Sequence, residues 1–265
     1  MEQNLSKKTR TESDLIGSRE VPESALYGVQ TLRGIENFRI SKFHLNEYPL
    51  FIQALAITKM GAAVANRELD LLTEEQTDAI LRACKEILEG KHHEQFPVDM
   101  IQGGAGTTTN MNINEVVANR ALELMGHQRG EYQYCSPNDH VNRSQSTNDA
   151  YPTAIHIGLY YTHLKLVKHF EVLIEAFRKK GSEFAHIIKM GRTQLEDAVP
   201  MTLGQTFNGF ASILEHEVKN LDFAAQDFLT VNMGATAIGT GITAEPEYAE
   251  KCIAALRKIT GLGTE

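Results

Sequence analysis

The feature that most constrains the fold is a pair of long amphipathic segments in the second half of the chain. In residues 148–188, apolar side chains recur every three or four positions, and Pro152 falls in the first turn, where its missing N–H does little harm. At about 1.5 Å per residue, such a helix would span roughly 50–60 Å. The second segment begins at a capping box formed by Thr202 and Gln205 and runs to near Gly234.

Helices of this length need partners along their whole apolar stripe. The sequence therefore predicts a mainly α protein with a long-helix bundle that other copies of the chain complete. A plain antiparallel hairpin of two helices within one chain is the alternative, and it would leave much of both stripes in contact with water.

Shorter helices are predicted on either side of this pair. Thr73 and Gln76 form a capping box before an apolar-periodic segment that stops at Gly90, and a further helix is expected over residues 247–259. Up to about Pro49 the sequence is predicted to be irregular. We expect an N-terminal domain over residues 1–145 and a central long-helix domain over residues 146–265, the latter incomplete.

Composition excludes several classes of protein. The 265 residues contain 26 Lys and Arg against 34 Asp and Glu, a net charge of −8, which disfavours nucleic-acid binding. Three cysteines without C-x-x-C spacing indicate neither a disulfide framework nor a thiolate metal site, and His92-His93-Glu94 lacks the spacing of helical metal ligands. No stretch resembles a signal peptide or a membrane span, so we expect a cytoplasmic protein without a membrane partner.

Three polar segments lie at or near the starts of predicted helices: residues 103–115, 144–149 and 191–205. The first has three glycines in four positions, which would let backbone N–H groups approach a ligand. The second gathers hydroxyl and amide donors at a helix N-terminus, a place that attracts carboxylates. The third is expected to be a loop between the two long helices. The alternative interpretation is that these residues are helix caps, ion pairs and solvated loop charges.

With the second segment extended back to residue 138 and the third to residue 190, they read G-G-A-G-T-T-T-N-M-N-I-N-E, N-D-H-V-N-R-S-Q-S-T-N-D and M-G-R-T-Q-L-E-D-A-V-P-M-T-L-G-Q. In this order they resemble the aspartase and fumarase superfamily, and its aspartase members most closely, from about Gly17 to about Gly261. The resemblance implies a cofactor-independent lyase that converts L-aspartate reversibly to fumarate and ammonium through an aci-carboxylate intermediate. It also implies a homotetramer whose sites are shared between subunits and bind a small dicarboxylate.

The same resemblance assigns roles to six residues: Thr107, Ser146, Thr147, Asn148, Thr193 and Gln194. The first three would hold the β-carboxylate, where negative charge develops, and Asn148 would contact the departing amino group. Thr193 would contact the other carboxylate from a neighbouring subunit. Gln194 stands where many relatives have His, and because an amide cannot titrate near neutrality we expect it to orient substrate.

One part of the family pattern is missing. The family's general base is a serine in a Gly-Ser-Ser loop, and this sequence contains no Gly-Ser-Ser run, so we expect the base beyond Glu265 and an inactive chain on its own. No metal ligands are expected, and no residue argues for activation by a divalent cation. Two alternatives stay open: a class II fumarase-type hydratase, which would usually carry His at position 194, and a non-catalytic helical oligomerisation fragment.

Overall fold

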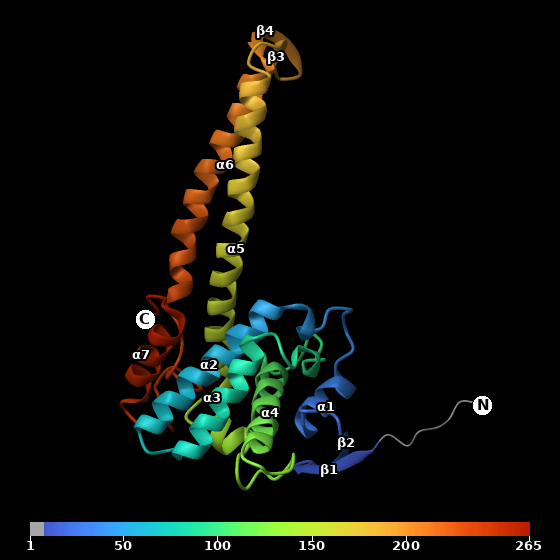
Figure 1. Cartoon of the computed structure of the whole chain (residues 1–265), viewed down its shortest axis with the longest axis vertical. Coiled ribbons are helices and arrows are strands. Elements are labelled where there is room, and N and C mark those ends of the chain that lie inside the picture. The colour runs from blue at the N-terminus through green and yellow to red at the C-terminus, as the bar shows by residue number, and fades with distance from the viewer. Residues whose placement is uncertain (1–7) are drawn as a thin grey trace, which may run out of the picture. The chain divides into compact units, whose positions relative to one another are not determined.

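The computed structural model describes residues 8–265, which form a mainly α protein, as the sequence predicts (Figure 1). They divide into two compact units. The first contains the described residues up to Gly158 together with Leu229–Glu265, and the second is Leu159–Phe228. Helix α5, Thr147–Glu183, begins in the first unit and continues into the second. The predicted division between residues 145 and 146 stays a prediction.

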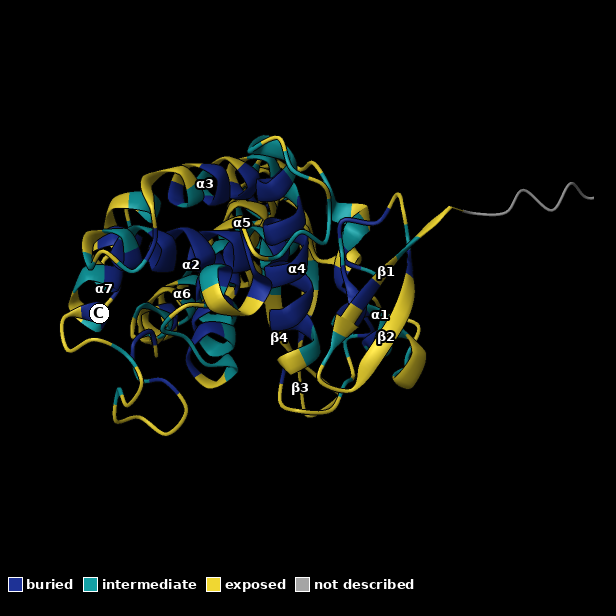
Figure 2. Ribbon diagram, turned by 90° about the horizontal axis from the view of Figure 1, so that it is seen from below, coloured by how far each residue is buried: buried dark blue, intermediate teal, exposed yellow. Residues whose placement is uncertain are grey.

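The first unit is built on helices that pack around a shared apolar core. Helix α2 packs against α3 and α7, and α4 packs against α3 and α1, as the dark blue of α2 and α4 in Figure 2 reflects. Their bounds are α1 Val29–Asn37, α2 Pro49–Glu68, α3 Glu74–Leu88, α4 Thr107–Leu124 and α7 Tyr248–Thr260. Single-turn helices cover Leu45–Glu47, His93–Gln95, Pro137–Val141 and Gln226–Leu229, the last of these at the junction of the units. The most deeply buried side chains include Ile52, Leu55, Ile80, Ile113, Leu122 and Leu256.

The prediction that the chain is irregular up to Pro49 is wrong. Strands β1, Thr9–Asp14, and β2, Gly17–Pro22, form an antiparallel hairpin, and α1 follows it. Polar side chains of the two strands face each other: the hydroxyl oxygens of Ser13 and Ser18 lie 2.7 Å apart. Because apolar residues do not alternate along either strand, periodicity gives no sign of this hairpin.

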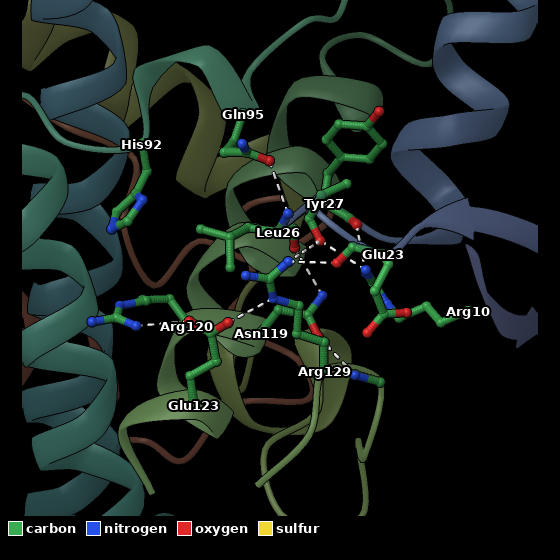
Figure 3. A network of polar contacts seen from close by, with 12 residues as sticks. Arg10, Glu23, Leu26, Tyr27, His92, Gln95, Asn119, Arg120, Glu123 and Arg129 are labelled. Atoms are coloured by element: carbon green, nitrogen blue, oxygen red, sulfur yellow. Dashed lines mark hydrogen bonds and ion pairs between the residues drawn. The ribbon is translucent and has the colours of Figure 1, made fainter. Parts of the chain in front are cut away.

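The hairpin is fastened to the helices through residues 23–27 (Figure 3). The guanidinium of Arg10 donates hydrogen bonds of 2.8–3.0 Å to three carbonyls in or beside this segment. Arg129 donates to the first carbonyl of the segment at 2.6 Å, and the N–H of Leu26 donates to Oε1 of Gln95 at 2.8 Å. These bonds fix the path of the chain into α1.

The second unit pairs the distal part of α5 with α6, Leu203–Ala225, and joins them by a β-hairpin (Figure 1). The predicted capping box is confirmed, because Oγ1 of Thr202 accepts from the N–H of Gln205 at 3.1 Å and the side chain of Gln205 returns to Thr202. Helix α6 ends at Ala225 and not near Gly234 as predicted. The capping box of Thr73 and Gln76 in the first unit is confirmed as well.

The predicted loop between the long helices is wrong, because it forms strands β3, Ile188–Thr193, and β4, Glu196–Thr202. Gln194 and Leu195 make a two-residue turn with φ of +48° and +68°. Both residues at positive φ match the twist of a tight hairpin. Among residues 8–265, no helix has both the length and the apolar character needed to cross a membrane.

Candidate functional site

The polar run Ser146-Thr147-Asn148 lies at the N-terminus of α5, as predicted. The hydroxyl oxygen of Ser146 accepts from the backbone N–H of Asn148 at 3.2 Å, and the N–H of Ser146 donates to Oδ1 of Asp149 at 2.9 Å. These reciprocal bonds resemble a helix cap. No hydrogen bond donated by the Ser146 hydroxyl is found among residues 8–265, so its O–H can donate to a ligand.

The hydroxyl oxygen of Thr147 also accepts a hydrogen bond, in this case from a residue of a different helix. Its half-buried Oγ1 accepts from the amide Nδ2 of Asn110, on α4, at 3.1 Å. No hydrogen bond donated by this hydroxyl is found among residues 8–265, so it too can present its hydrogen to a ligand.

Asn148 is exposed and offers an acceptor. Its Nδ2 donates to the carbonyl of Ala237 at 2.8 Å, and within residues 8–265 its Oδ1 accepts no hydrogen bond. An amide anchored by its nitrogen presents its oxygen, which suits a positively charged ammonium group.

Thr107 is the first residue of α4 and follows the glycine-rich turn. Its hydroxyl donates to the carbonyl of Gly104 at 2.7 Å, so it bonds within its own turn. Gly106, at φ +95°, lies so close to Tyr151 of α5 that a Cβ would meet the ring at 2.4 Å. A glycine is therefore required where the turn meets the start of α5.

Thr193 and Gln194 belong to the second unit, at the end of β3 and in the hairpin turn, and both are exposed. The structure thus groups four of the six predicted residues in the first unit and two in the second. That all six serve one site stays a prediction.

A buried lysine, which sequence reasoning missed, underlies this region. Lys59 of α2 is 1% exposed, and its Nζ donates to Oδ1 of Asn110 at 2.7 Å, to Oδ1 of Asn142 at 3.1 Å and to Oε1 of Gln145 at 2.8 Å. Burial lowers the pKa of Lys59 to about 7. The only signal in the sequence is one lysine within the apolar part of α2.

Asp149 is the last residue of the second polar segment, and the sequence assigns it no role. It is fully buried, and its two carboxylate oxygens accept from the N–H of Ser146 and the N–H of Thr236, each at 2.9 Å. Burial raises the pKa of this carboxyl. The side chain ties the start of α5 to the loop that carries Ala237.

Metal-binding geometry is not found in the described part of the chain: among residues 8–265, no three His, Cys, Asp or Glu side chains gather so that they could hold a metal ion. In the run His92-His93-Glu94, His92 pairs with Glu86, and Nε2 lies 2.9 Å from Oε2. That the protein needs no cofactor stays a prediction.

Comparison with known proteins gives consistent matches over almost the whole chain. Residues 17–265 match the family described as "Lyase". The aspartate ammonia-lyase of Pseudomonas canavaninivorans is 56% identical over 253 residues, which are 95% of this chain and 53% of that protein. The aspartate ammonia-lyase of Escherichia coli K12 is 54% identical over 97% of this chain and 54% of its own length. The chain therefore spans about half the length of the curated relatives it matches.

Solved structures agree with the sequence matches. A fumarate lyase:delta crystallin protein from Brucella melitensis superimposes with a TM-score of 0.95 at 50% identity, over 97% of this chain and 56% of that one. A recombinant class II fumarase from Schistosoma mansoni gives 0.87 at 35% identity, over 96% of this chain and 53% of that one. Both likenesses extend over the segments that carry the candidate residues.

Proposed function

The chain belongs to the lyase family whose pattern residues 17–265 match, and from this we propose that the protein is an aspartate ammonia-lyase that converts L-aspartate reversibly to fumarate and ammonium. Support comes from the named relatives at 54–56% identity and from the donors at the start of α5. The proposal concerns the complete gene product that carries this sequence.

The physical difficulty of this reaction is the acidity of the carbon. A hydrogen beside a carboxylate is a very poor acid, and its removal leaves an aci-carboxylate with two negative charges on one group. Donors that are already oriented toward the developing charge contribute roughly 3–4 kcal/mol each in comparable sites. We propose that Ser146, Thr147 and Thr107 bind the β-carboxylate, and the positive end of the α5 dipole adds to this effect.

The remaining groups would bind the other end of the substrate. Oδ1 of Asn148 would accept from the amino group that leaves, and Thr193 of a neighbouring subunit would contact the α-carboxylate. Gln194 would orient substrate without transferring a proton, since an amide does not titrate near neutrality. The 265 residues contain no Gly-Ser-Ser run, and none of them is assigned the removal of the proton.

One observation carries the proposal. At the start of α5, the hydroxyl oxygens of Ser146 and Thr147 each accept a hydrogen bond from the protein, while Asn148 is anchored by its nitrogen. Two neighbouring hydroxyl hydrogens and one amide oxygen are thereby left to a ligand. This pattern fits a carboxylate next to an ammonium group, which is the arrangement in aspartate.

Self-association is part of the proposal. Large apolar side chains are exposed on the second unit, among them Val172 at 71% and Phe223 at 83%. Exposed apolar surface on this scale is typical of an interface. We propose that other copies of the chain cover it, in a cytoplasmic homotetramer whose sites combine residues of different subunits.

A fumarase-type hydratase is the second candidate, because the Schistosoma mansoni class II fumarase shares 35% identity and the same fold. The two reactions share the aci-carboxylate and differ in the leaving group. Gln194 favours the ammonia-lyase, since fumarases characteristically have His at this position.

The test is to supply the complete gene product with L-aspartate and follow fumarate by its ultraviolet absorbance. We expect fumarate to form, and Asn148→Ala to lower turnover strongly. Hydration of fumarate to malate without action on aspartate would convert the assignment to a hydratase. If this chain alone forms a defined oligomer with neither activity, that result would support the oligomerisation fragment instead.

A further inference from the structure

We propose that Lys59 is a positioning residue: it fixes the amide of Asn110 so that the hydroxyl of Thr147 points its hydrogen at the substrate carboxylate. This inference rests on the proposed function. It adds a residue from α2 that does not touch substrate and acts through two hydrogen bonds in series.

The first step concerns the amide of Asn110. An amide can be turned over, which exchanges its oxygen and its NH2 group. Nζ of Lys59 lies 2.7 Å from Oδ1 of Asn110, and its two other partners, Oδ1 of Asn142 and Oε1 of Gln145, are also oxygens, so Nζ serves as the donor here and the oxygen of Asn110 faces it. The turned amide would place NH2 against the ammonium, and Lys59 therefore selects one of the two orientations.

The second step follows from that selection. With Oδ1 toward Lys59, the two N–H bonds of Nδ2 point at Oγ1 of Thr147, 3.1 Å away, and at Oδ1 of Asn142, 3.2 Å away. Thr147 must then accept from Asn110, and its own hydrogen cannot lie on that bond. If the amide were turned, its oxygen would face Thr147 and would draw the hydroxyl hydrogen away from a ligand.

The lysine also holds the chain that leads into α5. All three hydrogen-bond partners of its Nζ are acceptors, and two of these, Asn142 and Gln145, precede Thr147 by five and two residues. Asn142 Oδ1 accepts from Asn114 as well, at 3.1 Å. The position of Thr147 and the orientation of its hydroxyl thus depend on the same buried group.

The most direct test is Asn110→Asp in the complete gene product. The new carboxylate keeps an oxygen for Lys59 and gains a charge opposite the ammonium, so we expect the variant to fold. It loses the donors to Oδ1 of Asn142 and to Thr147, and the hydroxyl of Thr147 would then donate to the carboxylate. We expect kcat/KM for aspartate to fall by about tenfold to a hundredfold, mostly in kcat, which is less than the 10²–10³-fold loss typical of deleting a donor outright.

A double-mutant cycle separates orientation from general disruption. In a Thr147→Val background no hydroxyl remains to be oriented, so adding Asn110→Asp should change kcat/KM by less than about twofold. Effects that multiply in the double variant would overturn the proposal, as would an Asn110→Asp enzyme with wild-type kcat/KM.

Lys59→Met provides the second variant, and Thr58→Val is its matched control. Thr58 is the preceding residue of α2 and is fully buried, and among residues 8–265 its hydroxyl hydrogen-bonds only to the carbonyl of Ala54 within its helix. We expect Lys59→Met to lower kcat/KM when Thr147 is present and to change it little in the Thr147→Val background. Thr58→Val should keep the wild-type kcat/KM. If neither Asn110→Asp nor Lys59→Met depends on Thr147, the inference is wrong.

Binding of succinate, measured by calorimetry, distinguishes this inference from the proposed function. If the wild type does not act on aspartate, the proposed function fails, and weaker succinate binding by Asn110→Asp, about tenfold, would still support the role of Lys59. Equal binding by the two proteins would overturn it. A wild type that binds no dicarboxylate would overturn both.

Discussion

The carboxylate of Asp149 is the best place to test whether the start of α5 is held as described. Its two oxygens serve two backbone donors, the N–H of Ser146 and the N–H of Thr236, each at 2.9 Å. In Asp149→Asn one oxygen becomes NH2. Because Thr236 is buried and Ser146 is only half-buried, we expect the remaining oxygen to keep Thr236 and the NH2 group to face Ser146.

The cost can be worked out from these contacts. A backbone N–H that loses its acceptor while partly buried costs about 1–3 kcal/mol, and bonds to a charged acceptor lie at the upper end of that range. Asp149→Asn loses one such bond, so we expect the free energy of unfolding to fall by about 2 kcal/mol. Asp149→Ala loses both and should cost about twice as much.

The assay is urea unfolding followed by circular dichroism at a fixed protein concentration, combined with limited proteolysis. The control is Asp78→Asn, an exposed position on α3. We also expect faster cleavage in the exposed residues 237–240, which Asp149 anchors through Thr236. If the free energies of unfolding of both Asp149 variants lay within about 0.5 kcal/mol of the control's, the two hydrogen bonds would contribute little to stability and the reasoning would be refuted.

Two further predictions concern the first unit. Arg120 holds the pKa of Glu86 at about 2, against an ordinary 4.5, so the ion pair stabilises the fold fully above pH 4.5 and loses this effect as the pH falls toward 2. Unfolding measured as a function of pH should lose this dependence in Glu86→Gln. Allowing for solvent screening, the same variant should lower the free energy of unfolding by about 1–2 kcal/mol. Gly106→Ala should lower the thermal midpoint by an amount equivalent to about 2 kcal/mol or more, because its Cβ meets Tyr151 at positive φ, whereas Gly209→Ala, with open space around it, should not.

Helices were predictable where their signals are local. The capping boxes at Thr73 and Thr202 involve residues three positions apart, so the sequence marked both helix starts correctly. The β3–β4 hairpin was not predictable in this way. Its turn, Gln194-Leu195, lacks the Asn-Gly or Asp-Gly pair that usually occupies two positions of positive φ. The local sequence therefore contains no turn signal that would predict a hairpin.

The site shows the same division between local and distant information. Ser146, Thr147 and Asn148 are consecutive, and a helix N-terminus brings their polar groups together without help from the rest of the fold. Lys59 lies 51 residues before Asn110 and 86 before Gln145, and it is placed by packing of α2 against the other helices. A local pattern cannot report that such a residue touches the site, although a lysine in an apolar helix indicates a buried charge that must have partners.

The hydroxyl groups proposed to bind the β-carboxylate are not equivalent, and the difference lies in the direction of each hydrogen. Ser146 and Thr147 accept from the protein and can donate to a ligand without rearrangement. Thr107 donates to the carbonyl of Gly104 and must break that bond first, at a net cost of about 0.5–1.5 kcal/mol. Donors oriented in advance stabilise developing charge with little reorganisation. Stabilisation of the aci-carboxylate should therefore depend most on the start of α5, with Thr107 contributing only after its turn has adjusted to the substrate.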